Sequence, residues 1–557
     1  MSKPHAFLAL PLLLLLLLFS FSSSNSLALE DDDIHARNAS LVSAETACNS
    51  TPDPAFCLST LPDANATSDV RHFGRYFMQR SFSRACRFLS LVDEHLLRVR
   101  AHLTAPEARA LEDCRHVAVL NVEFLLKSSK LVDDKARELP AKEVDDVRTL
   151  LSAVLTNQET CSDGLQWAVA SSRIKGGLPV RLSEDTKLHS ASLALFNKGW
   201  SSRKGEAATR YSESTLMPLR LSQVSVNMSS LTRAFYASLS KKHIFAAGQH
   251  NTVLIRDIVV VKKDGSGNFT SINEAVRAAP NNVDGSNGYF LIYITAGIYH
   301  EYVYVNSNKK NLMMVGNGIN RTVITGDRNA HDGWSILSSP TFTVEAPHFI
   351  AMDMTFRNTA GPEKGQAVAV RNSGDRSTFY RCSFEGYQDT LFTHFFRQSY
   401  RECDIYGTVD FIFGDATAVF EKCNVYPRRP QKGQYNAITA QARSNGDEET
   451  GIYFRNCTIR AADDLAKSNY YVETYLGRPW KDYSRTVYMH TFMDSLIHPA
   501  GWHDWNGTDF ALSTLYYAEH NNTGPGSNTT NRVNWPGYHV ISSDKEPDFG
   551  GSNFFPG

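Results

Sequence analysis

The feature that most constrains the fold of this chain is a frame of Cys, Gly and Asp that occurs twice. "CSFEGYQDTLF" begins at Cys382 and "CDIYGTVDFIF" begins at Cys403, and each places a Gly four residues and an Asp seven residues after its Cys. The two frames start 21 residues apart. Similar phrases recur at about this spacing, namely "MTFRNT", "FYRCSFEG", "YRECDIYG", "FEKCNVYP" and "YFRNCTIRA". Short β-rich units that repeat in this way are typical of a solenoid.

We therefore predict that residues 255–557 fold as a right-handed parallel β-helix. Each repeat then makes one coil, and successive coils stack at the strand spacing of about 4.8 Å. A β-sandwich also has short strands, but it gives no reason for a repeated frame of three residue types. Stacking should bring Cys382, Cys403 and Cys423 within the separation of about 4.4–6.8 Å between Cα atoms that a disulfide requires.

The same stacking makes Asp389 and Asp410 close neighbours on the outside of the solenoid. At about 5 Å and an effective dielectric constant near 20, two carboxylates repel by roughly 3 kcal/mol. One of them should therefore keep its proton while the other is ionised, which provides an acid and a nucleophile at one site. A solvated ladder of aspartates and a calcium site are the alternative interpretations of the pair.

The first half of the chain has a helical period instead. Apolar residues recur every three or four positions over 84–103, 111–138, 141–161 and 183–200. This pattern predicts an antiparallel four-helix bundle within residues 39–200. Residues 201–254 are polar and mixed, and we interpret them as a linker or processing region before the domain at 255–557.

Residues 1–28 are typical of a cleaved signal peptide. A basic Lys3 precedes an apolar run over residues 7–19, and small polar residues follow. The run is too short to span a bilayer comfortably, so we expect a secreted chain with no stable membrane anchor after cleavage. The formal net charge of −1 gives no reason to expect a nucleic-acid partner. Candidate glycosylation sites suit secretion: Asn38, Asn49, Asn65, Asn227, Asn268, Asn320, Asn456, Asn506, Asn521 and Asn528.

Secretion makes the nine cysteines candidates for disulfides. Cys48 and Cys57 flank a Pro-containing turn, while Cys114 and Cys161 lie in separate predicted helices. The simplest pairing in the helical half is one local and one interhelix disulfide, with Cys86 unpaired.

Polar residues that could serve a reaction surround the two aspartates. Gln388 precedes Asp389, and Gln366 lies about one coil earlier, so that two amides could donate hydrogen bonds to an oxyanion. Further along, "YLGRPWK" contains Arg478, which could hold a carboxylate with two hydrogen bonds. The same phrase contains Trp480, a flat apolar surface for a sugar ring.

At these residues the chain resembles the plant pectin methylesterases (pectinesterases) that carry an N-terminal inhibitor-like domain. The similar phrases are "GIYHE", "QAVAVR", "GYQDTLF", "GTVDFIFG" and "YLGRPWK", in the order of the family. "CNSTPDPAFC" and the helical half are similar to the pectinesterase-inhibitor bundle. The resemblance implies a carboxylic ester hydrolase that removes methyl esters from cell-wall pectin and releases methanol. It implies no cofactor and no metal, and an inhibitor-like domain as an intramolecular partner that acts as an autoinhibitory or folding pro-region.

The resemblance also implies roles for individual residues. Asp410 would be the nucleophile and Asp389 the general acid and base. Gln366 and Gln388 would line the oxyanion site, and Gln366 would also contact substrate. Arg478 would orient Asp410 and bind substrate, and Trp480 would contact the polymer.

The same resemblance pairs Cys403 with Cys423 and leaves Cys382 and Cys457 reduced. Glu301 in "GIYHE" is better interpreted as a structural anchor of the first coils than as a catalytic acid.

Two other functions remain open for this sequence. One is a non-catalytic pectin-binding or inhibitor protein, which would need no pair of acid and nucleophile. The other is a calcium-dependent pectate lyase, which would need a carboxylate cluster for Ca²⁺ and a free arginine as base.

Overall fold

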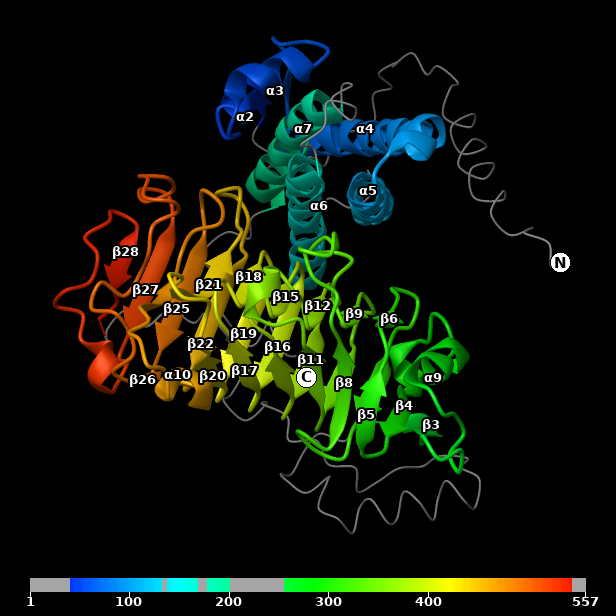
Figure 1. Ribbon diagram of the computed structural model, residues 1–557. Coiled ribbons are helices and arrows are strands. Elements are labelled where there is room, and N and C mark those ends of the chain that lie inside the picture. The colour runs from blue at the N-terminus through cyan, green and yellow to red at the C-terminus, as the bar shows by residue number, and fades with distance from the viewer. Residues whose placement is uncertain (1–40, 133–137, 169–177, 201–254, 543–557) are drawn as a thin grey trace. The chain divides into compact units, whose positions relative to one another are not determined.

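A computed structural model describes residues 41–132, 138–168, 178–200 and 255–542 of the chain. The predicted signal peptide and linker lie outside the described residues. The described part begins with helices, and parallel strands follow from Ile255 (Figure 1). The prediction of a helical bundle followed by a β-solenoid is therefore confirmed.

Four long helices make up most of the helical part, and their starts have a local cause. The side chain of Asp69 accepts a hydrogen bond from the backbone N–H of Arg71 at the start of α4. Thr104 and Glu107 form a capping box at the start of α5. The long helices are α4 (Val70–Val99), α5 (Ala105–Leu131), α6 (Ala141–Ala168) and α7 (Leu178–Trp200). Two short helices, α2 (Ala44–Cys48) and α3 (Pro54–Thr60), precede them. The β1 strand (Val42–Ser43) pairs with β2 (Thr67–Ser68).

The first long helix begins earlier than the sequence predicted. The apolar pattern of the sequence predicts a helix from Arg84, whereas α4 begins at Val70. The added segment contains Gly74, which lowers helix propensity. A Cβ atom on Gly74 would lie 3.0 Å from the ring of Trp200 in α7, so the glycine allows these two helices to pack closely.

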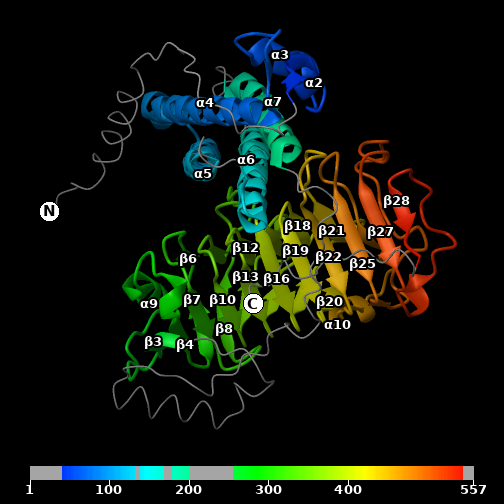
Figure 2. The same cartoon turned by 180° about the vertical axis from the view of Figure 1, so that it is seen from behind.

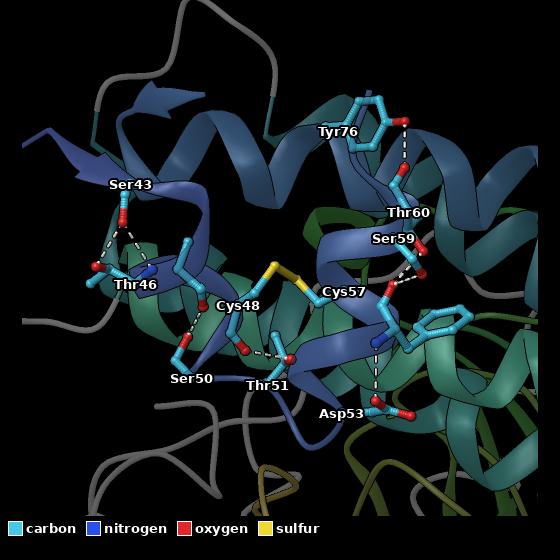
Figure 3. Close-up of a disulfide and its surroundings, with 12 residues drawn as sticks. Ser43, Thr46, Cys48, Ser50, Thr51, Asp53, Cys57, Ser59, Thr60 and Tyr76 are labelled. Atoms are coloured by element: carbon cyan, nitrogen blue, oxygen red, sulfur yellow. Dashed lines mark hydrogen bonds between the residues drawn. A yellow bond between two sulfur atoms is a disulfide. The ribbon is translucent and has the colours of Figure 1, made fainter. Parts of the chain in front are cut away.

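Two disulfides lie in the helical part. Cys48 and Cys57 join α2 to α3 (Figure 3), and Cys114 joins Cys161 between α5 and α6. In the close-up, Asp53 accepts a hydrogen bond from the backbone N–H of Phe56 at the start of α3. Both predicted pairings are thus found, and Cys86 is a buried free thiol.

The strands from β3 onward form three parallel sheets, and neighbouring strands of each sheet come from successive coils (Figures 1 and 2). Parallel crossovers of this kind are right-handed in nearly all proteins. The first sheet contains, in chain order, β3 (Ile255–Val261), β4 (Tyr289–Ile294), β7 (Leu312–Val315), β10 (Ile350–Met352), β13 (Ser377–Tyr380), β16 (Arg397–Arg401), β19 (Thr417–Glu421), β22 (Gly451–Arg455), β25 (Arg485–Met489), β27 (Tyr516–His520) and β28 (Tyr538–Val540).

The second sheet contains β5 (Gly297–His300), β8 (Thr322–Gly326), β11 (Thr355–Asn358), β14 (Ser383–Glu385), β17 (Asp404–Gly407), β20 (Asn424–Pro427), β23 (Thr458–Ile459) and β26 (Phe492–Met493). The third contains β6 (Val303–Val305), β9 (Phe342–Val344), β12 (Val370–Asn372), β15 (Leu391–Thr393), β18 (Ile412–Gly414), β21 (Asn436–Gln441) and β24 (Thr474–Gly477). The third sheet carries the candidate site.

Stacked aromatic rings fill the inside of the solenoid along the first sheet. The ring of Tyr400 lies 4.6 Å from that of Phe420, which lies 4.9 Å from Phe454, and Phe454 lies 4.5 Å from Tyr488. Each ring belongs to the next coil, so the core repeats with the strands. Stacking of this kind stabilises the coils beyond the area that they bury.

Glu301 has the structural role expected of it. Its carboxylate accepts hydrogen bonds from the backbone N–H groups of Ile272 and Asn273, at the start of helix α9 (Ile272–Ala278). It therefore anchors this helix to the first coils. Another short α-helix in the described part of the solenoid is α10 (Asp463–Ala466).

Candidate active site

Asp389 and Asp410 lie on adjacent coils in matching positions. Each is two residues before a strand of the third sheet, and β15 pairs with β18 so that Leu391 is opposite Ile412. The backbone N–H of Asp389 donates to the carbonyl oxygen of Val409, with 3.1 Å between the nitrogen and the oxygen. Both aspartates have a positive φ, 61° and 52°, a backbone region that Asp and Asn enter more readily than other side chains. The stacking expected from the repeated frame is present.

The glycines of the frame are explained by close approach. A Cβ atom on Gly407 would lie 2.1 Å from the Cβ of Phe411, and one on Gly386 would lie 2.6 Å from Oγ1 of Thr390. That hydroxyl donates to the carbonyl oxygen of Tyr406 at 2.9 Å, which ties the two coils together. The glycines thus leave room for the turn that carries each aspartate.

Arg478 contacts only one of the two aspartates through hydrogen bonds. It follows β24, and its Nε and Nη2 donate to the two carboxylate oxygens of Asp410 at 2.8 and 2.6 Å. Burial disfavours the charged guanidinium, but the charge of Asp410, its hydrogen bonds and the charges of Tyr435 and Asp389 together raise the pKa of Arg478. The bidentate contact holds the Asp410 carboxylate in a fixed orientation.

The protonation of Asp389 is set by its surroundings. Its side chain is buried, and burial together with the negative charge of Asp410 raises its pKa well above the ordinary value for Asp. The charge of Arg478 and a hydrogen bond with Gln366 oppose the shift without cancelling it. Asp389 is therefore the member of the pair that is suited to hold a proton.

The two glutamines also lie on adjacent coils. The backbone N–H of Ala367, next to Gln366, donates to the carbonyl oxygen of Gln388 at 3.1 Å. Both glutamine residues are half-buried. Strand register places Gln366 one residue out of line with Gln388, because Val370 pairs with Leu391. Gln366 still reaches the carboxyl group of Asp389 on the next coil.

Trp480 is the last predicted residue of the site. Its ring centroid lies 5.9 Å from that of Phe413, which is in the strand that follows Asp410. Its backbone N–H donates to the carbonyl oxygen of Gln441 at 3.3 Å, so it continues along the edge of β21. The predicted residues thus lie in segments next to neighbouring strands of the third sheet, from β12 to β24.

The sequence did not reveal two aromatic partners of Arg478. The Tyr435 hydroxyl accepts a hydrogen bond from Nη1 at 2.7 Å, and the Trp505 ring lies 4.4 Å from the guanidinium carbon. Tyr435 is itself stacked on the ring of His503, with 4.3 Å between centroids. These residues belong to segments outside the repeated frame, so no spacing pointed to them.

The predicted disulfide between Cys403 and Cys423 is wrong in this structure. Both are buried free thiols, as are Cys382 and Cys457. The four cysteines stack on successive coils, so Cys403 has a cysteine on either side and no unique partner. The Cys423 thiol instead lies 3.3 Å from the carbonyl oxygen of Tyr400, to which it donates. Hydrogen bonds of this kind satisfy the thiols in their reduced form.

The helical bundle contacts the solenoid at the third sheet through apolar side chains. One buried apolar cluster joins α4, α5, α6 and α7 to the strands of the candidate site. Its members include Phe88, Leu111, Val117 and Leu165 from the bundle and Val368, Phe392, Phe413 and Ala440 from the solenoid. Trp480 packs against the same cluster.

Polar contacts surround this apolar cluster. Lys481 donates to Glu159 and Asp163 of α6 at 2.8 and 2.9 Å. Nearby, the Thr156 hydroxyl donates to the buried carboxyl group of Asp415 at 2.7 Å, and burial raises the pKa of Asp415 to about 7. Other pairs that join the two parts are Arg397 with Asp145 and Asp146, His116 with Glu345, and Ser335 with Asp113.

None of the helices in the described ranges combines the length and apolarity needed to cross a membrane. In the same ranges, no three His, Cys, Asp or Glu side chains gather in a way that could hold a metal ion.

Comparisons with known proteins agree with this architecture. Residues 258–557 match the family model described as Pectinesterase, and residues 42–195 match that described as Plant invertase/pectin methylesterase inhibitor. The chain is 52% identical over 529 residues to "Probable pectinesterase/pectinesterase inhibitor 41" of Arabidopsis thaliana, and the matched region covers 92% of this chain and 92% of the relative. It is 41% identical over 517 residues to "Pectinesterase 2" of Citrus sinensis, covering 92% of this chain and 91% of the relative. Among solved structures, the pectin methylesterase from carrot is 44% identical with a TM-score of 0.51, covering 56% of this chain and 94% of that one.

Proposed function

This chain belongs to the pectinesterase family of carboxylic ester hydrolases, and we propose that it removes methyl esters from the galacturonate units of cell-wall pectin and releases methanol. The observation that supports this most directly is the pair of stacked aspartates in different states. Arg478 holds the carboxylate of Asp410, whereas burial and repulsion favour a protonated Asp389. A nucleophile and an acid are thereby provided at one place.

In the proposed reaction, a carboxylate oxygen of Asp410 attacks the carbonyl carbon of the methyl ester. The amides of Gln366 and Gln388 donate hydrogen bonds to the oxyanion that forms. As the bond to the methoxy group breaks, Asp389 gives its proton to the departing oxygen, and methanol leaves. Water then attacks the anhydride between Asp410 and the sugar acid while Asp389 takes a proton from it. This second step returns both aspartates to their initial states.

The test is methanol release from methylated pectin by the purified protein, with and without a chelator. The proposed esterase releases methanol in both conditions, whereas unsaturated products that require calcium would identify a lyase instead. Asp410→Asn should abolish turnover without unfolding the protein, because Asn tolerates the same positive φ. Asp389→Asn should lower the rate at least a few hundredfold, within the range of acid–base catalysis. Substantial methanol release by the Asp410→Asn protein would eliminate this nucleophile.

The competing lyase function is disfavoured by the contacts of the arginine. A lyase needs a free arginine as base, but Arg478 is committed to Asp410 and Tyr435. A purely binding protein would have no use for an acid and a carboxylate held in different states. The esterase is therefore the function that the site supports best.

We further propose that the bundle inhibits the solenoid while it is docked. Its support is the apolar cluster that includes Phe413, three residues after Asp410, and packs against Trp480. Asp145→Asn combined with Asp146→Asn should weaken docking, because Arg397 loses two of its partners, and should raise methanol release. Glu184→Gln is the control, since its ion pairs remain inside the bundle. Equal activity of the double variant, the control and the native chain would contradict autoinhibition.

We also propose that the protein is secreted to the cell wall and glycosylated. The proposed domain limits are 39–200, 201–254 and 255–557. These proposals are supported by the signal-like residues 1–28 and by relatives named as pectinesterases. Mass spectrometry of the secreted protein would identify its first residue and its glycans. An N-terminus that still includes residues 1–28 would contradict the predicted cleavage.

A further inference from the structure

Lys481 is a lysine whose ion-pair partners all come from the helical bundle. It follows Trp480 directly and is three residues from Arg478, so its Cα is within about 10 Å of that arginine along the chain. Its side chain is only 16% exposed. Among the described residues, its ion pairs are with Glu159 and Asp163 of α6, at 2.8 and 2.9 Å.

The two acidic residues are placed to present a pair of carboxylates. They are four residues apart on α6, and residues at this spacing lie on the same face of a helix. Burial alone would lower the pKa of Lys481, but the charges of both carboxylates offset it and raise the pKa. When the bundle leaves, these carboxylates leave with it, and a charged lysine remains beside Trp480 without an ion-pair partner in the described solenoid. An exposed ammonium group next to an aromatic ring, which two carboxylates contacted before, can accept another carboxylate in their place.

We propose that Lys481 is a binding subsite for the free carboxylate of an already de-esterified galacturonate unit, and that Glu159 and Asp163 occupy this subsite as substitutes for it. The inference rests on the proposed function, because a polymer of galacturonate acquires such a carboxylate at each ester that is hydrolysed. The subsite would make partly de-esterified pectin bind more tightly than fully methylated pectin. It would also let the acidic polymer compete with the bundle for the same ammonium group.

The experiment separates release of the bundle from binding of the polymer. Glu159→Gln combined with Asp163→Asn frees Lys481 while leaving it in place, and Lys481→Gln is then added to this double variant. Both proteins are assayed for methanol release on fully methylated pectin and on partly de-esterified pectin. Their binding of fully de-esterified oligogalacturonate, which needs no turnover, is measured by calorimetry.

We expect the added Lys481→Gln change to raise KM about tenfold on partly de-esterified pectin, the loss of one charge-assisted hydrogen bond. The kcat value on that substrate and KM on fully methylated pectin should not change, and oligogalacturonate should bind about tenfold more weakly. Lys467→Gln is the matched control, because Lys467 is 79% exposed and pairs only weakly with Asp463. It should alter neither KM nor binding.

Two results would overturn the subsite. One is equal oligogalacturonate binding with and without Lys481→Gln, and the other is an equal rise in KM on both pectins. Failure of the proposed function would give another result. In that case none of these variants releases methanol from fully methylated pectin, and the calorimetric comparison still decides whether Lys481 binds the polymer.

Discussion

Gly407→Ala should damage both the stability and the activity of this protein through one contact. The added Cβ would lie 2.1 Å from the Cβ of Phe411 and 2.5 Å from its Cγ. Ordinary carbon contacts are about 3.5 Å or longer, so Phe411 would have to withdraw by about 1.4 Å. Phe411 is buried in the solenoid core, where overpacking costs about 1–3 kcal/mol. We expect about 3 kcal/mol, because the obstacle is an atom close to the backbone rather than the end of a flexible side chain.

The displacement also reaches the candidate nucleophile, because Phe411 is bonded to Asp410. A shift of about 1 Å in a catalytic group can lower a rate about a hundredfold. We therefore expect the midpoint of thermal unfolding to fall by about 6 °C or more and methanol release to fall about a hundredfold.

Gly285→Ala is the matched control in the same solenoid. Its nearest neighbour would be Oδ1 of Asn311 at 3.5 Å, an ordinary contact, so neither quantity should change appreciably. Calorimetry and the methanol assay on the same preparations measure both effects. If Gly407→Ala behaves as Gly285→Ala does, the explanation given for the repeated glycine is wrong.

Three further results are expected. Tyr435→Phe should lower methanol release about fivefold, the loss of one hydrogen bond to Arg478, while Tyr435→Trp, which cannot accept that bond, should do no better. Burial raises the pKa of Asp113 to about 6 at its contact with the solenoid, so docking favours the protonated form of this carboxyl group. Docking of the bundle should therefore weaken as the pH rises from about 4.5 to 6. Asp113→Asn should flatten this dependence, as measured by fluorescence transfer between bundle and solenoid, and an unchanged slope would contradict the role of this carboxyl group. Replacing both Cys114 and Cys161 by Ala should destabilise the bundle by about 2–4 kcal/mol in chemical denaturation, and an unchanged midpoint would refute this.

The repeated frame was sufficient to predict the solenoid and the meeting of its two aspartates. A period of about one coil fixes which residues stack, and the observed pairing of Leu391 with Ile412 has the same offset of 21 residues. Stacking also predicted that one aspartate of the pair keeps its proton, but not which one. The raised pKa of Asp389 comes first from burial and then from the charge of Asp410, and burial could not be derived from spacing. Spacing alone therefore predicts which residues stack, whereas the state of each aspartate depends on its burial and its partners.

Contacts that do not depend on the repeat could not be derived in this way. Tyr435 and Trp505 reach Arg478 from segments between and after the strands, where sequence carries no register. The start of α4 was missed because Gly74 serves the ring of Trp200, a contact between residues far apart in the chain. The error at Cys403 has a different cause. Stacking brings cysteines together but does not determine whether they are oxidised.

The left-handed backbone at Asp389 and Asp410 limits how this site can decay during evolution. Most replacements there would strain the turn and threaten the whole stack, whereas Asn would keep it, and Asp and Asn codons differ by a single base. A single-base change from Asp to Asn would thus remove a carboxylate of the site while keeping the backbone turn. We expect relatives that have lost the activity in this way to keep the fold and to carry Asn at one of the two positions.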